Sequence, residues 1–152
     1  MKELTLLSGI TGVTAAKIAA DARALTAMNL LTEGRGLMLT ERDAREIAET
    51  RHRAIRDNGR VEIGIGAVEK LMLVFSGSPF VQPKDWAALV NTLVDCFYFI
   101  KTDTHDAVND NELIRMMLDE FEEHCQGDET MFCQRMEALV RRINGEEDAD
   151  GE

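Results

Sequence analysis

The sequence predicts an all-α protein that folds as a single compact bundle of five or six helices. Three observations support this prediction. Apolar residues recur at helical spacing through most of the chain. The 152 residues suit one domain with a substantial core. Glycines, prolines and capping residues fall mostly between the periodic segments. A short apolar step at 37–39 and an alternating stretch at 61–65 could add a minor two-stranded ribbon.

The first three helices are placed from their apolar positions and their end signals. The first extends over about residues 13–31, where alanines favour helix, and it stops before the glycines at 34 and 36. The second extends over about residues 41–58, with Thr40 suited to cap its N-terminus and Gly59 to end it. The third is short, at about 67–75, and a Ser-Gly-Ser-Pro turn follows it.

The remaining helices have clearer start signals. Pro83 suits the first position of the fourth helix, which has the strongest apolar periodicity in the chain and should be central to the core. Asn109, with Glu112 three residues later, resembles a capping box for a fifth helix at about 110–124. Gly127 is the expected stop of that helix. Asp128 should cap the last helix, which Asn144 and Gly145 close.

The net charge of −11 is concentrated in the last third of the sequence. Residues 1–101 contain 13 basic and 12 acidic side chains, whereas residues 102–124 contain eight acids and Arg115 alone. We therefore predict a helical domain over 1–145, followed by a disordered acidic tail over 146–152. An acidic protein is not attracted to phosphate backbones or anionic lipid, so we expect no direct nucleic-acid binding and no membrane association.

Cysteine and histidine content argues against a disulfide framework and against a metal site. Three cysteines without a C-x-x-C pair are typical of reduced thiols, which together with the lack of a membrane-length apolar run predicts a cytoplasmic protein. His124 and Cys125 are adjacent and Cys133 lies eight residues on, whereas zinc ligands come in closely spaced pairs. The Gly64-Ile65-Gly66 step lacks the rest of a phosphate-binding loop. We expect no metal, no cofactor and no catalytic residue.

Arg51 lies on the apolar side of the second helix, one turn from Ile47 and Ile55. An unpaired buried guanidinium is very costly, so this position predicts a buried ion pair. Glu62 on the following stretch is the first candidate partner and Asp95 is the second. An anchor for a partner protein and a catalytic role are the alternatives.

Acidic side chains recur along the outer face of the predicted fifth helix, at Glu112, Asp119, Glu122 and Glu123. A row of carboxylates can imitate the phosphates of nucleic acid and occupy a basic groove on another protein. The alternative is an ordinary solvated helix face, which Arg115 favours because it interrupts the row.

Several short segments resemble an uncharacterised bacterial family of small helical proteins, a domain of unknown function, over about residues 36–142. They are Gly36–Glu41, Asp43-Ala44, Arg51, Gly59–Glu62, Lys70-Leu71, Phe75, Ser78–Phe80, Phe97-Tyr98, Lys101, Glu112–Ile114 and Cys125 with Gly127. The resemblance implies a bacterial or phage setting and a helical fold, but no reaction, ligand or catalytic residue. It also implies that Arg51, Arg60 and Glu62 form one unit around the turn at Gly59.

These observations favour a non-enzymatic protein-interaction module whose partner is another protein. Docking would use an apolar or methionine-containing helix surface, or the acidic helix. The first alternative is an acidic inhibitor that imitates nucleic acid against a nuclease or another nucleic-acid-binding enzyme. The second is a small-molecule-binding or catalytic domain that holds an anion near Arg51, Arg60 and Glu62.

Overall fold

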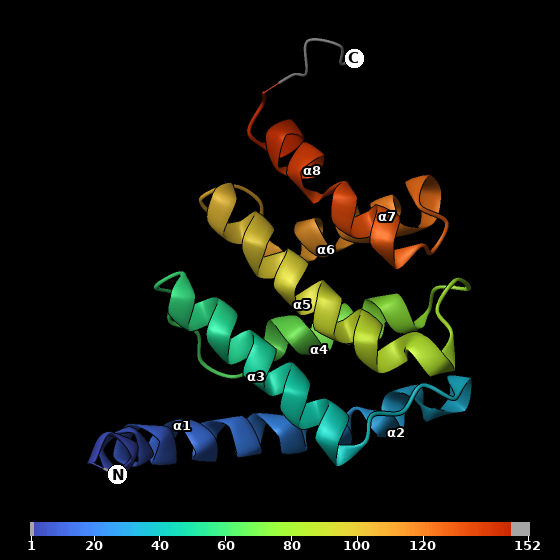
Figure 1. Cartoon of the computed structure of the whole chain (residues 1–152). Coiled ribbons are helices and arrows are strands. Elements are labelled where there is room, and N and C mark those ends of the chain that lie inside the picture. The colour runs from blue at the N-terminus through green and yellow to red at the C-terminus, as the bar shows by residue number, and fades with distance from the viewer. Residues whose placement is uncertain (1, 147–152) are drawn as a thin grey trace.

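The computed structural model describes the backbone of residues 2–146 and the side chains of residues 12–146, and this part of the chain is all-α with no β-strand (Figure 1). In chain order its elements are α1 (Lys2–Ala27), α2 (Asn29–Thr32), the 3₁₀ turn η1 (Glu33–Arg35), α3 (Glu41–Asp57), α4 (Gly66–Ser76), the 3₁₀ turn η2 (Pro83–Asp85), α5 (Trp86–Asp103), α6 (Asp110–Asp119), the π-helical turn η3 (Glu120–His124), α7 (Glu129–Gln134) and α8 (Met136–Ile143). The predicted fold class is confirmed.

The helices are more numerous than the predicted five or six because two predicted helices are broken. The first breaks at Met28, between α1 and α2, which lets the Asn29 side chain reach the backbone of Leu39. The last breaks at Arg135, between α7 and α8, where the Arg135 guanidinium turns toward Glu120. The fifth ends as an α-helix at Asp119, and a π-helical turn continues it.

The predicted two-stranded ribbon is wrong, since neither of its segments is a strand. Asn29 accepts a hydrogen bond from the Leu39 backbone N–H (2.8 Å) and donates one to the Leu39 carbonyl (2.9 Å). Thr32 donates to the carbonyl of Leu37 at 2.5 Å. These side chains occupy the backbone groups that a neighbouring strand would need. Val61 and Ile63 on the other segment are almost fully exposed.

Helix α5 occupies the centre of the molecule (Figure 1). Helix α3 packs on it with α1 beyond, α8 packs on it from another side, and α4 joins α5 to α6. Trp86, Phe97 and Tyr98 of α5 are fully buried. The Phe121 ring of η3 meets Phe75 of α4 and Phe132 of α7 edge-on, with centroids 5.4 and 5.8 Å apart. These aromatic contacts hold η3 and α7 on α4.

The helix starts that the sequence indicates are formed by side-chain caps. Thr40 accepts from the Asp43 N–H and Asp43 accepts from the Thr40 N–H, a complete capping box for α3. Asn109 accepts from the backbone of Glu112, and Asp128 accepts from the backbone of Met131. Pro83 opens η2, which leads directly into α5.

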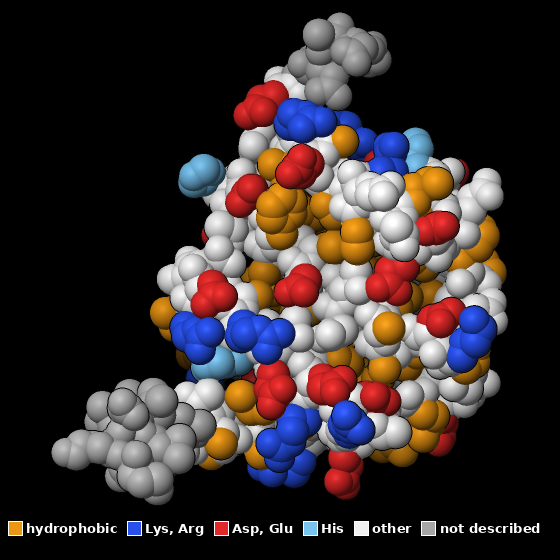
Figure 2. Space-filling view, in the orientation of Figure 1, with side chains coloured by type: hydrophobic (Ala, Val, Ile, Leu, Met, Phe, Trp, Pro, Cys, Tyr) orange, Lys and Arg blue, Asp and Glu red, His pale blue; other side chains and the backbone are white. Residues whose placement is uncertain are grey.

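None of the helices between residues 2 and 146 is long and apolar enough to cross a membrane. The predicted acidic tail over 146–152 lies outside the described residues except for Glu146. On the face shown in Figure 2, acidic and basic side chains are interspersed, with small apolar patches between them.

Candidate functional site

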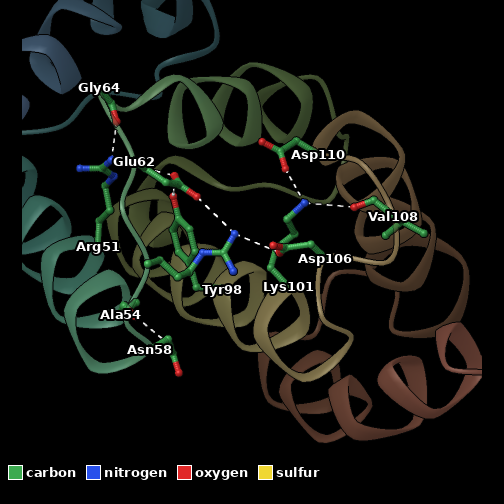
Figure 3. Close-up of polar contacts among 11 residues, drawn as sticks. Arg51, Ala54, Asn58, Glu62, Gly64, Tyr98, Lys101, Asp106, Val108 and Asp110 are labelled. Atoms are coloured by element: carbon green, nitrogen blue, oxygen red, sulfur yellow. Dashed lines mark hydrogen bonds and ion pairs between the residues drawn. The ribbon is translucent and has the colours of Figure 1, made fainter.

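Arg51 is buried at the junction of α1, α3 and the segment that follows α3. Its side chain is only 5% exposed. Its Nη1 lies 3.1 Å from Oδ2 of Asp21 on α1. Its Nη2 donates to the Gly64 carbonyl and lies 4.0 Å from Oε1 of Glu62 (Figure 3). The guanidinium is therefore surrounded by two carboxylates and one carbonyl. This arrangement ties α1 to α3 and to the 60–64 segment.

Sequence reasoning named Glu62 and missed Asp21, the nearer of the two carboxylates. A signal for Asp21 was present, since it lies between Ile18 and Leu25 on the stripe of α1 that faces the core. Asp95, the second candidate partner, is exposed on α5, and it is Arg53 whose charge acts on it.

Glu62 is the centre of a wider polar network that reaches α5. Its Oε1 accepts a hydrogen bond from the Tyr98 hydroxyl at 2.7 Å, and its Oε2 lies 3.5 Å from Arg60 Nη2. The same Arg60 nitrogen lies 3.0 Å from Asp106, and the guanidinium rests on the Tyr98 ring (Figure 3). Burial and the hydrogen bond to Glu62 raise the pKa of Tyr98, so this hydroxyl stays protonated and donating. The structure thus places Arg51, Arg60 and Glu62 together.

The chemistry of this network is mainly internal. Arg51 and Arg60 each face two carboxylates, so most of the positive charge near the cavity beside them is already matched. The charge of Lys101, at the end of α5, is also matched within the protein. Its buried Nζ lies 2.7 Å from Asp110 and donates to the Val108 carbonyl at 3.0 Å, which fixes the loop between α5 and α6 (Figure 3).

The four acidic residues of the predicted row lie on two segments. Glu112 and Asp119 are exposed on α6, whereas Glu122 is half-buried and Glu123 exposed on η3. Because a π-helical turn has more residues per turn than an α-helix, the spacing of the row changes between the two segments.

Glu120 is the acidic residue of this region that sequence reasoning missed. Its side chain is 2% exposed, and its carboxylate lies 2.5 Å from Arg135 Nε and 3.2 Å from Arg142 Nη1. Burial alone would raise the pKa of Glu120, but the hydrogen bonds from the two arginines outweigh it and hold the pKa below its ordinary value. The position could have been found, since Glu120 lies one turn after Met117 on the buried stripe.

Glu120→Gln should remove a stabilisation that depends on pH. Because the pKa of Glu120 is lower in the folded protein, the charged carboxylate stabilises the fold fully above its unfolded pKa and less as pH falls through the folded pKa. The stability difference between wild type and Glu120→Gln should therefore be largest at neutral pH and shrink below about pH 4. Urea unfolding between pH 7 and pH 3 measures it, with the exposed Glu123→Gln as control. A difference that stays constant with pH would contradict the assignment.

An apolar groove lies open between α4 and α6. Leu73 and Val74 of α4 line it together with Ile114 and Leu118 of α6, in a hollow of about 390 Å³. Leu73 is 45% exposed and Val74 40% exposed, although both belong to a helix that packs on the core.

Polar and charged side chains border this groove. Lys70 and Arg115 lie at its edges with Asn111. Both cations are exposed, and neither makes an ion pair within the described part of the chain. The groove thus combines an apolar floor with a basic rim in a protein whose net charge is −11. Sequence reasoning missed it because it is built from two helices that are far apart in the sequence.

Comparison with known proteins places the chain in a family. A model described as a family of unknown function (DUF6323) matches residues 24–149. The chain belongs to this family. The match extends beyond the predicted 36–142 at both ends. A search of curated proteins and a search of solved structures each found no match.

Segments that carry the family resemblance meet at two places in the structure. Arg51, Arg60, Glu62, Tyr98 and Lys101 belong to the polar interactions of Figure 3. The second place joins the turn before η2 to the turn after η3. Gly127 has φ +83°, and a Cβ added there would lie 2.6 Å from the Cβ of Phe80. At both places the contacts hold elements of the protein to one another.

Proposed function

We propose that this protein is a non-enzymatic interaction module that binds a helix of another protein in the groove between α4 and α6. The observation that supports this proposal is the apolar floor made by Leu73, Val74, Ile114 and Leu118, in which Leu73 and Val74 are exposed and Ile114 is buried. Grooves between two helices that leave aliphatic side chains open are a recurring way of binding the apolar face of an amphipathic helix.

Burial of the groove supplies a driving force for binding. Leu73 and Val74 retain nearly half of their surface in the free protein. Covering the exposed remainder of each would contribute about 1 kcal/mol, since full burial of such a side chain is worth about 1.5–3 kcal/mol. Burial of the partner's aliphatic side chains contributes a similar binding free energy. A short helix can therefore bind with useful affinity.

The rim defines the chemistry of the partner. Lys70 and Arg115 present positive charge at the groove edges and have no ion-pair partner among residues 12–146. The complementary ligand is a helix with an apolar stripe flanked by aspartate or glutamate. Long-range attraction contributes little, because the protein as a whole is acidic and repels such a ligand.

The two alternative functions have less support. An acidic inhibitor that imitates nucleic acid would use Glu112, Asp119, Glu122 and Glu123, but Arg115 lies among them and Glu120 is turned inward onto arginines. An anion-binding or catalytic site would use Arg51 and Arg60, whose guanidinium groups are engaged by Asp21, Glu62 and Asp106.

Selection from a library of displayed helical peptides tests the proposed function. Peptides selected on wild type should carry apolar residues at helical spacing with acidic residues beside them. They should bind Leu73→Asp about tenfold more weakly or worse, a loss of about 1.4 kcal/mol. Val61→Asp is the matched control, because Val61 is almost fully exposed and lies outside the groove. This variant should bind like wild type.

Charge reversal on the rim gives a second readout. Lys70→Glu combined with Arg115→Glu should weaken the acidic-flanked peptides, since both cations then become repulsive. Selected peptides that bind Leu73→Asp as tightly as wild type would contradict the proposal. A basic consensus whose binding is lost on reversal of Glu112, Asp119, Glu122 and Glu123 would favour the nucleic-acid-mimic alternative instead.

A further inference from the structure

Two cysteines from different helices lie at the α5–α7 contact. Cys96 on α5 is buried, and Cys133 on α7 is exposed. Both side chains line one cavity between these helices. The buried and the exposed cysteine therefore border the same space.

A second contact one turn earlier on both helices holds this pair in register. The Thr92 hydroxyl of α5 donates to the Glu129 carboxylate of α7 at 2.5 Å. Thr92 precedes Cys96 by four residues, and Glu129 precedes Cys133 by four. Since residues four apart lie on the same face of a helix, the two contacts form successive steps between α5 and α7.

A cavity of about 460 Å³ opens beside both cysteines. Cys96 and Cys133 line it together with the apolar side chains of Phe99 and Met136. A small molecule can enter this space and reach the Cys133 sulfur. Cys125, the third cysteine, is buried after η3 and does not line the cavity.

We propose that Cys96 and Cys133 are a reversible redox pair, oxidised to an intramolecular disulfide by a hydroperoxide. The Cys133 thiolate attacks the peroxide oxygen, which breaks the O–O bond, releases hydroxide and leaves a sulfenic acid on Cys133. The Cys96 sulfur then attacks the Cys133 sulfur, so that the S–S bond forms and water leaves with the Cys96 proton. A low-molecular-weight thiol reverses the reaction by thiol–disulfide exchange.

The charges around the pair make this oxidation slow at neutral pH and faster in alkali. Burial raises the pKa of Cys133, the neighbouring Cys96 thiol lowers it, and the carboxylates of Glu129 and Asp95 raise it. Burial is also the main cause of the raised pKa of Cys96, which Asp95 and Glu129 raise further. Since only the thiolate reacts, the rate should rise with pH as more Cys133 ionises.

Thiol mapping of the full chain tests this pair. The reduced protein is treated with hydrogen peroxide, quenched, denatured and alkylated, and its peptides are mapped by mass spectrometry. The free thiols should fall from three to one, with Cys96 linked to Cys133 and Cys125 still alkylated. Dithiothreitol should restore all three.

Two variants distinguish this pair from other oxidation. Cys125→Ser should still lose both of its thiols to the disulfide, whereas Cys133→Ser should keep both of its thiols free. Three alkylated cysteines after peroxide treatment of wild type would overturn the proposal. It would also be overturned by Cys133 reaching sulfinic acid, or forming an intermolecular dimer, while Cys96 stays free.

Discussion

Arg51→Met should lower the melting temperature by roughly 6 to 12 °C, corresponding to a loss of about 3 kcal/mol. The methionine fills the space of the arginine stem, so the main loss is electrostatic. Asp21 loses the guanidinium 3.1 Å away, and Glu62 retains only Arg60 and Tyr98. Removing one partner from a buried pair is costly because the other charge remains in a poorly solvated place. Thermal unfolding followed by circular dichroism measures the change.

Arg42→Met is the matched control for this variant. Arg42 also lies on α3, and its ion pair with Glu46 is a surface pair with the Arg42 side chain 87% exposed. Exposed pairs contribute about 0–1 kcal/mol, so its melting temperature should stay close to that of wild type. If Arg51→Met melted within 2 °C of wild type, roughly the error of the measurement, the pairing with Asp21 and Glu62 would not be a structural requirement.

Gly127→Ala should be about as damaging as Arg51→Met, at roughly 2 to 5 kcal/mol. Two costs combine. The backbone at Gly127 has φ +83°, which an L-residue adopts only at a cost of about 1–2 kcal/mol. In addition, the new Cβ would lie 2.6 Å from the Cβ of Phe80. Because that carbon is attached directly to the backbone, the two turns must move apart, at about 1–3 kcal/mol. Urea unfolding of the variant measures the sum.

Gly59→Ala separates the two costs. Gly59 also has a positive φ, +65°, but a Cβ there would meet no atom within 4 Å. The stability loss of Gly59→Ala should therefore contain the conformational cost alone, about 1–2 kcal/mol. Equal losses for the two alanine variants would mean that the contact with Phe80 contributes nothing.

Much of the fold could be predicted from local sequence signals. Thr40 and Asp43 mark the start of α3 because their bonds are made within the first turn, and Asp128 marks α7 in the same way. The ribbon could not be excluded from sequence, since its failure depends on Asn29 and Thr32 reaching the backbone of the 37–39 segment.

The polar interactions were predictable where the partner follows soon in the chain. Glu62 lies eleven residues after Arg51, but Asp21 lies thirty residues before it and required the α1–α3 packing to be known. Glu120 was left out of the predicted acidic row and given no role, although its helical position is inward. The groove depends on α4 and α6 becoming neighbours, which no local pattern encodes.

The central claim, that the groove between α4 and α6 receives a helix of a partner protein, is tested most directly by comparative co-purification. Tagged wild type, Leu73→Asp and Val61→Asp are used to capture proteins from the native lysate after nuclease treatment. We expect a partner retained by wild type and Val61→Asp, lost with Leu73→Asp, and still bound at moderate salt. A partner captured equally by all three proteins, or no partner on any of them, would contradict the claim.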